Sequence, residues 1–120
     1  MATKVRAKGQ TEIERYTYRI TWSDEDQEYV GLCAEFPSLS WLDNTQEAAL
    51  RGIRDVVKEA ISDMQLNNER IPQPLATKNY SGKFTVRLPP DVHKSLTIQA
   101  AEAKVSISRL VSSKLAKQWL

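Results

Sequence analysis

The chain has 120 residues, of which 41% are hydrophobic, and a formal net charge of +2. This length allows one domain or two very small ones. No apolar run approaches the roughly 20 residues of a membrane helix, and no apolar stretch follows the basic N-terminus as it would in a secretory signal. We therefore expect a cytoplasmic protein with no membrane partner.

The chain has one cysteine, Cys33, and one histidine, His93. A single cysteine forms neither an internal disulfide nor a cysteine zinc cluster, and a nucleophilic thiol needs a histidine base close by. Cys33 and His93 fall in different regions of the pattern described below. We expect a buried structural thiol, a surface histidine, no metal and no cofactor.

Charge is divided unevenly along the chain. Residues 1–77 contain nine Lys/Arg and thirteen Asp/Glu, a net charge of −4, whereas residues 78–120 contain eight and two, a net charge of +6. This asymmetry indicates a basic region that meets a polyanion and an acidic region with another task. A solvated basic helix surface is the alternative.

The first region has the pattern of a small sheet. Residues 1–13 are polar and lack periodicity, so we expect a flexible leader. Residues 16–22 alternate strictly between apolar and polar side chains, which indicates a half-buried strand. A polar turn and two more short strands, over residues 28–35 and 39–42, complete a predicted β-meander.

A helix is predicted after the meander. Asn44 or Thr45 can cap it, and apolar residues from Ala49 to Met64 recur at helical spacing to form one stripe. The stripe gives the sheet a partner to pack against. We expect residues 14–68 to form one domain and residues 69–82, with two prolines that cannot continue a helix, to form a linker.

Residues 83–120 show a second, different pattern. Residues 83–88 alternate like a strand, Pro89 and Pro90 end it, and a helix is predicted from Pro90 to Ala103. Ser106 is a good N-cap for another helix. A lone strand leaves its backbone unpaired, so we expect it to pair antiparallel with the same strand of a second copy. The dimer core would then comprise Phe84, Val86, Leu88, Leu96, Leu110 and Val111.

The opposite face of that two-stranded ribbon carries Lys83, Thr85 and Arg87 from each copy. A β-ribbon fits the DNA major groove, where these side chains reach base edges. Backbone N–H groups at the start of the second helix can hold a phosphate. The predicted phosphate contacts are Ser106, Ile107, Ser108, Lys104 and Arg109.

The strand Lys-Phe-Thr-Val-Arg-Leu-Pro at 83–89 and the segment Val-Ser-Ile-Ser-Arg-Leu-Val at 105–111 resemble the ribbon-helix-helix family of the Arc and MetJ repressors. The resemblance implies that exposed strand residues read bases and that the second helix anchors phosphate. It assigns these roles to the strand and helix residues given above.

A longer pattern resembles the HicB antitoxin family. It comprises Ala-Glu-Phe-Pro at 34–37, Thr-Gln-Glu-Ala-Ala-Leu at 45–50, Ile-Pro at 71–72 and Tyr-Ser-Gly-Lys-Phe at 80–84. The resemblance implies an α+β protein whose degraded ribonuclease-H-like N-terminal domain blocks a HicA-like mRNA-cleaving toxin. It implies that the ribbon-helix-helix part represses the operon as a dimer, tetramer or higher oligomer.

Other interpretations remain open. A stand-alone ribbon-helix-helix regulator without a toxin is the alternative function. A metal-dependent nuclease is disfavoured, because Asp24, Glu25 and Asp26 are consecutive in a turn and two-metal chemistry needs converging carboxylates. Asp24, Asp26 and Trp41 are candidate toxin contacts, and Trp41 departs from the small residues frequent in the family. Trp119 is either a helix-end anchor or an oligomer contact.

Overall fold

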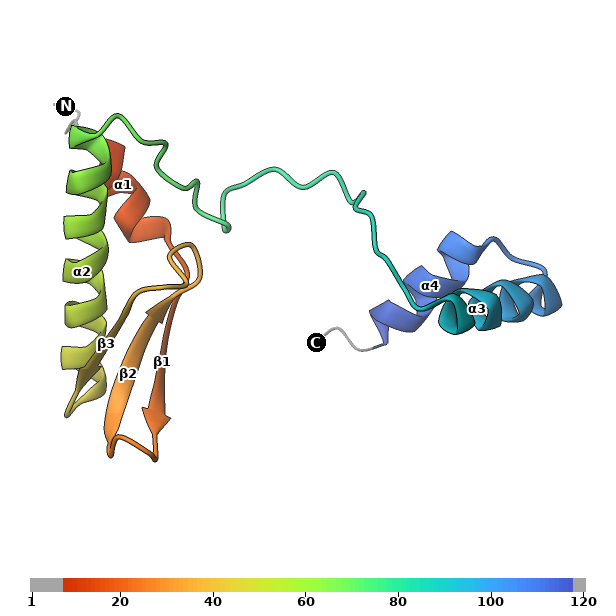
Figure 1. Ribbon diagram of the computed structural model, residues 1–120, viewed down its shortest axis with the longest axis horizontal. Coiled ribbons are helices and arrows are strands. Elements are labelled where there is room, and N and C mark those ends of the chain that lie inside the picture. Colours follow the sequence, from red (N-terminus) through yellow and green to blue (C-terminus); the bar gives the residue numbers. More distant parts are fainter. Residues whose placement is uncertain (1–7, 118–120) are drawn as a thin grey trace, which may run out of the picture. The chain divides into compact units, whose positions relative to one another are not determined.

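The computed structural model describes residues 8–117, which form an α+β fold, as predicted. Two compact units divide the chain between Tyr80 and Ser81. The first unit contains α1 (Lys8–Arg15), β1 (Tyr18–Ser23), β2 (Glu28–Cys33), β3 (Ser40–Asp43) and α2 (Gln46–Leu66) (Figure 1). The second contains α3 (Pro90–Ala103) and α4 (Ile107–Ala116). No helix within residues 8–117 is both long and apolar enough to cross a membrane.

The three strands form an antiparallel meander in the order β1-β2-β3, which confirms the predicted sheet. Trp22 of β1 lies opposite Tyr29 of β2, which lies opposite Asp43 of β3. Directly opposite residues point to the same side of a sheet, so this row shares one face. The next row on that face is Ile20, Gly31 and Trp41.

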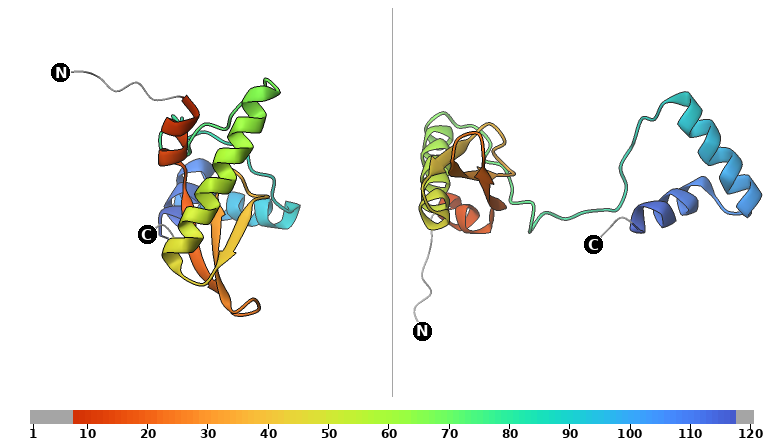
Figure 2. Two further views of the ribbon diagram at one scale, coloured as in Figure 1. Left: turned by 90° about the vertical axis from the view of Figure 1, so that its left-hand side faces the viewer. Right: turned by 90° about the horizontal axis from the view of Figure 1, so that it is seen from below.

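Helix α2 covers that same face of the sheet (Figures 1 and 2). The Thr45 side chain caps it by accepting a hydrogen bond from the N–H of Ala48 at 3.1 Å, as expected of an N-cap threonine. Helix and sheet approach closely at Gly31, where a Cβ atom would lie 2.6 Å from the carbonyl oxygen of Ala49. Glycine is therefore required for this packing distance.

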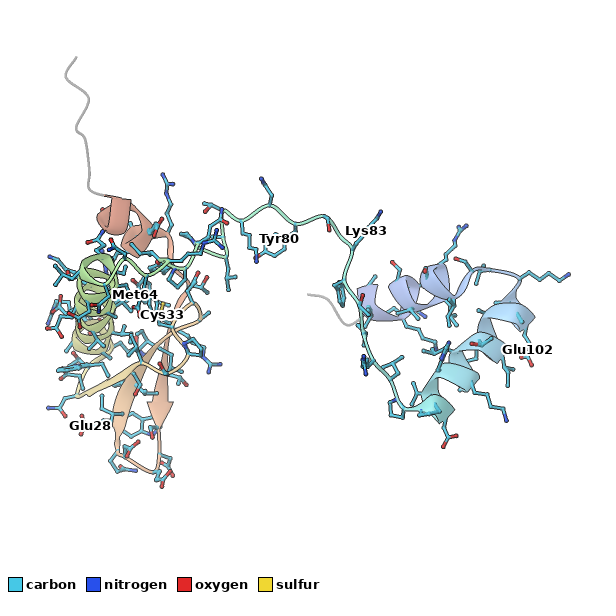
Figure 3. All side chains as sticks on the ribbon, turned by 45° about the horizontal axis from the view of Figure 1, so that its top comes forward. Glu28, Cys33, Met64, Tyr80, Lys83 and Glu102 are labelled. Carbon is cyan, nitrogen blue, oxygen red and sulfur yellow. The ribbon has the colours of Figure 1, made fainter. Side chains whose placement is uncertain are left out.

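The core lies between α2, α1 and the sheet, and it contains the predicted stripe of α2. Tyr16 and Phe36 pack edge to face, with ring centroids 5.3 Å apart. Cys33 is buried and free, and burial raises the pKa of its thiol to about 11. Cys33 belongs to the core cluster and Met64 packs against it; both residues are labelled in Figure 3. The prediction that the thiol is buried is confirmed. The buried residues of this core cluster are Ile13, Tyr16, Cys33, Phe36, Ile53, Val57 and Ile61.

The structure corrects the expected leader. Residues 8–13, taken as flexible, form most of helix α1, which packs against α2. Ile13 is buried in the core, and the carbonyl oxygen of Ile13 accepts a 2.8 Å hydrogen bond from the Tyr18 hydroxyl. One buried apolar side chain in a polar helix produces no periodicity in the sequence, so the pattern could not indicate it.

The expected linker, residues 69–82, is docked on the first unit over part of its length. Residues 71–75, here called the strap, contain the buried Pro74 and pack Ile71 against the core. The Tyr16 hydroxyl donates to the Pro72 carbonyl at 2.8 Å, and the Leu75 N–H donates to the Glu35 carboxylate at 2.9 Å. Prolines end a helix without preventing such packing.

Helix α3 begins and ends where the sequence predicts, and α4 begins directly after its predicted cap, Ser106. Pro90 occupies the first turn of α3, and Lys104, with a φ of 60°, ends it in the left-handed conformation. The Ser106 hydroxyl caps α4 by accepting from the N–H of Arg109 at 3.1 Å. Among the described residues of this unit, only Ala100 is a buried hydrophobic residue.

Candidate DNA and partner interfaces

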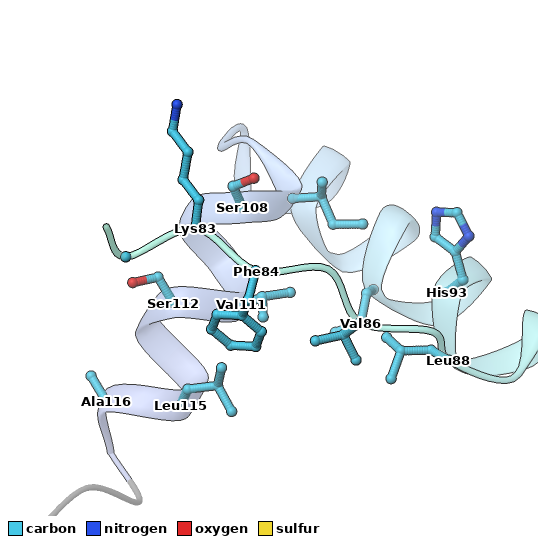
Figure 4. Close-up of a pocket in the computed structure, with 13 residues that line it drawn as sticks. Lys83, Phe84, Val86, Leu88, His93, Ser108, Val111, Ser112, Leu115 and Ala116 are labelled. Carbon is cyan, nitrogen blue, oxygen red and sulfur yellow. The ribbon is translucent and has the colours of Figure 1, made fainter. Parts of the chain in front are cut away.

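Residues 83–88 are extended but unpaired in the single chain. No backbone group of residues 84–88 has a hydrogen-bond partner within residues 8–117. Lys83 and Phe84 project from opposite sides of this segment (Figure 4), as the alternation of a strand requires. The segment therefore has the shape of a strand and the free donors and acceptors of one.

One side of this segment faces an apolar hollow of about 800 Å³ in the second unit. The Phe84 side chain is 78% exposed and that of Val86 is 57% exposed. Five of the six residues predicted for the dimer core line the hollow, whereas Leu110 is half-buried and does not. The structure thus gathers these apolar groups without covering them; the five are Phe84, Val86, Leu88, Leu96 and Val111.

The predicted base-contacting side chains alternate with the apolar ones. Lys83, Thr85 and Arg87 are all exposed. None of the three side chains has an ion pair or hydrogen bond within the described residues. Their charges and hydroxyl group are therefore available to a ligand.

The predicted phosphate site lies where α4 begins. Ser106 is the N-cap, and Ile107 and Ser108 are the first two residues of the helix. Helix geometry leaves the N–H groups of these first residues without intrahelical acceptors. Lys104 and Arg109, both exposed, contribute positive charge to the same end of α4. His93 is also exposed, as expected, and lines the hollow on α3.

The predicted toxin contacts come from two elements of the first unit. Asp24 and Asp26 lie in the exposed turn between β1 and β2, whereas Trp41 lies on β3 against Gly52 of α2. Asp26 accepts a 2.8 Å hydrogen bond from the Ser23 hydroxyl. The Asp26 carboxylate is thus bound within its own turn. Among residues 8–117, no group of three or more His, Cys, Asp or Glu side chains is placed to hold a metal.

Glu35 was not singled out by the sequence. Its carboxylate accepts hydrogen bonds from the N–H groups of Thr17 and Leu75, both at 2.9 Å. Partial burial opposes ionisation, but these backbone N–H groups outweigh it and lower the pKa of Glu35. A carboxylate just after a strand is compatible with a solvent-exposed turn, so the sequence gives no signal of this role.

Residues 65–115 match the family model described as the HicB family. This segment of the chain is similar to the HicB family. The match runs from the end of α2 through the strap, the unpaired segment and α3 into α4. HicB is an antitoxin family, so the matched segment points to a toxin–antitoxin-related protein. No curated protein and no solved structure matches it.

Proposed function

We propose that this chain is a member of the HicB family and the antitoxin of a type II toxin–antitoxin system. Its first unit binds and neutralises a HicA-like mRNA-cleaving toxin. Two copies of residues 83–120 form a ribbon-helix-helix that binds operator DNA and represses the operon. The observation that supports this most is the unpaired segment 84–88 beside an uncovered apolar hollow.

A second copy satisfies both needs of this segment at once. Antiparallel pairing of residues 83–88 from two copies gives the N–H and C=O groups of alternate residues a partner, which an isolated strand lacks. The same pairing places Phe84 and Val86 of both copies over the hollows. Burying a side chain such as Phe or Val contributes about 1.5–3 kcal/mol, so the gain is large for a unit with so small a core of its own.

The resulting ribbon has the chemistry of a major-groove reader. Lys83, Thr85 and Arg87 of each copy face away from the apolar side. Arg and Lys donate to guanine O6 and N7, and Thr contacts base edges or the thymine methyl group. The N–H groups at the start of α4 hold a backbone phosphate, with Lys104 and Arg109 beside them. The excess of basic residues after residue 77 supplies the electrostatic attraction to DNA.

The toxin is assigned to the first unit because that unit is folded independently of the DNA-binding segment and has the opposite charge. Residues 1–77 carry a net charge of −4. A protein that cleaves RNA must attract a polyanion, so its surface is expected to be basic. Asp24, Asp26 and Trp41 are exposed on the first unit and are the proposed contacts.

Operator binding tests the DNA-reading part of this proposal. We expect Arg87→Ala to weaken binding to the operon's own promoter by about 1–3 kcal/mol, with the loss concentrated at one base position. Lys58→Ala removes the same charge from α2 and should leave binding within about twofold. Equal affinity of wild type and R87A for every sequence tested would contradict base reading by the ribbon.

A stand-alone regulator is the second candidate function. The family match covers residues 65–115 and leaves most of the first unit outside it. The two functions differ in one measurable property: whether co-expression of this chain restores growth to cells that express the protein encoded beside it. Restored growth supports the antitoxin, whereas operator binding without any rescue supports the stand-alone regulator.

A further inference from the structure

Two tryptophans mark one end of the first unit's sheet. Trp22 and Tyr29 are cross-strand neighbours, and their rings pack edge to face with centroids 5.1 Å apart. Trp41 lies in the next row of the same face, against Gly52, where no side chain larger than hydrogen fits. The sheet register therefore gathers three aromatic rings at the end that carries the hairpin turn.

The two tryptophans are exposed although they are large and apolar. Trp22 is 47% exposed and Trp41 is 43% exposed. Each indole N–H donates to the aspartate two residues later, Trp22 to Asp24 at 3.4 Å and Trp41 to Asp43 at 3.1 Å. Each tryptophan ring therefore has an aspartate carboxylate at its N–H edge. We call these five residues the aromatic–acidic face: Trp22, Tyr29, Trp41, Asp24 and Asp43.

The carboxylates of this face have no ion-pair partner within residues 8–117. No Lys or Arg among the described residues forms an ion pair with Asp24 or Asp43. The pKa of Asp43 is lowered mainly by the N–H of Asn44 and then by the Trp41 indole, with a smaller effect from the charge of Arg51. Both carboxylates therefore lack a contacting cation within the described residues and are open to an external one.

We propose that the aromatic–acidic face is the docking surface for a basic protein, and that Arg or Lys side chains of that protein bind over the tryptophan rings. The inference rests on the proposed antitoxin function and names the surface and the chemistry by which the toxin is held. It adds Trp22, Tyr29 and Asp43 to the expected contacts.

Three physical arguments favour a cationic partner over an apolar one. A guanidinium or ammonium group is attracted to the face of a tryptophan ring, more strongly when water is excluded. A carboxylate at the ring's edge adds a charge-assisted hydrogen bond to the same cation. Exposed Trp, Tyr and Arg carry much of the binding energy at protein interfaces. The net charge of −4 in residues 1–77 favours approach of a basic surface.

The test compares two double variants of the full-length protein. Trp22→Ala with Asp24→Asn removes one ring and one charge from the face. Leu66→Ala with Asp63→Asn removes an 81% exposed apolar side chain and one charge from the last turns of α2. Both are made in a Trp119→Phe background, so that fluorescence comes from the remaining tryptophans of the first unit. The probes are an inactivated form of the toxin encoded beside the gene and an arginine decapeptide.

We expect W22A/D24N to raise the dissociation constant for both probes at least tenfold, and L66A/D63N to change it less than twofold. Equal weakening by both variants would mean diffuse attraction by an acidic unit and would overturn the docking surface. If wild type neutralises the toxin and neither variant affects binding, the surface is wrong while the antitoxin function stands. If wild type does not bind the toxin, the antitoxin function fails and this inference fails with it.

Discussion

In the first unit Ile53 and Val57 are fully buried between α2 and the sheet, whereas in the second unit Phe84 is 78% exposed beside an open hollow. Both units have amphipathic helices that begin at good caps. They differ in whether the apolar side chains of the unit are covered by residues of the same chain. In the first unit the meander covers them, and the second has a single extended segment without a partner.

This difference separates two kinds of stability. The first unit's core is independent of protein concentration, because every contact is made within the chain. The second unit's core is expected to form between copies, so that its stability follows the law of mass action. The loss of stability caused by a substitution should therefore depend on protein concentration in the second unit and not in the first.

Phe84→Ala should have the largest effect. Loss of a buried Phe side chain costs about 3–5 kcal/mol in a packed core, and a dimer loses two. We expect the dimer dissociation constant to rise at least 100-fold, measured by analytical ultracentrifugation. Tyr80→Ala, which removes an exposed ring just before Ser81, is the control and should leave it unchanged. A dimer of unchanged strength in F84A would place the dimer contact elsewhere.

Ile53→Ala tests the self-contained unit. We expect a loss of about 2–5 kcal/mol in the free energy of unfolding, because the side chain is fully buried beneath the sheet. Urea unfolding followed by circular dichroism measures it, and the loss should be the same at every protein concentration. Leu66→Ala is the exposed control. A loss that grows on dilution would contradict the independence of this core.

Glu35→Ala should release the strap from the first unit. A hydrogen bond to a charged group contributes about 1.5–3 kcal/mol, and Glu35 accepts one from the strap at Leu75 and another from Thr17. Limited proteolysis should then cut residues 71–75 faster, whereas Glu59→Ala on the outer face of α2 should not change the cleavage.

The same carboxylate predicts a pH dependence of stability. Its pKa is lower in the folded protein than the ordinary value of 4.5. Its contribution is therefore complete above the ordinary pKa and is lost as the pH falls through the lower folded value. Wild type should lose more stability than E35A over that acidic range in urea titrations. Parallel pH profiles would show that Glu35 does not hold the strap.

Ser106→Ala should have the smallest effect of the set. Loss of an N-cap hydroxyl costs about 1 kcal/mol, here the hydrogen bond to the N–H of Arg109. Thermal unfolding of the second unit should shift slightly, and the neighbouring Ser108→Ala should shift it less. Equal shifts in the two variants would argue that the hydroxyl of Ser106 adds nothing as a cap.

Most of the fold follows from patterns that the sequence displays. Strict alternation in residues 16–22, the apolar stripe of α2 and the caps at Thr45 and Ser106 each depend on neighbours close in the chain. Helix α1 and the strap depend instead on distant partners. Tyr16 reaches Pro72 and Glu35 reaches Leu75, and no local pattern encodes such pairs.

The candidate sites divide in the same way. The alternation of Lys83, Thr85 and Arg87 with apolar residues is local, so the two sides of the segment could be predicted. The aromatic–acidic face could not, because it depends on sheet register. Trp22 and Trp41 share a face only because β2 lies between their strands and pairs with both.

Hydrogen exchange of the amides in residues 84–88 tests the central claim most directly, since a second copy is proposed to complete the ribbon. At high protein concentration we predict strong protection of alternate amides in residues 84–88, those that face the partner strand. This protection should be lost on dilution below the dimer dissociation constant. The amides of β2 should stay protected throughout, because their partners belong to the same chain. Rapid exchange of residues 84–88 at every concentration would contradict the account.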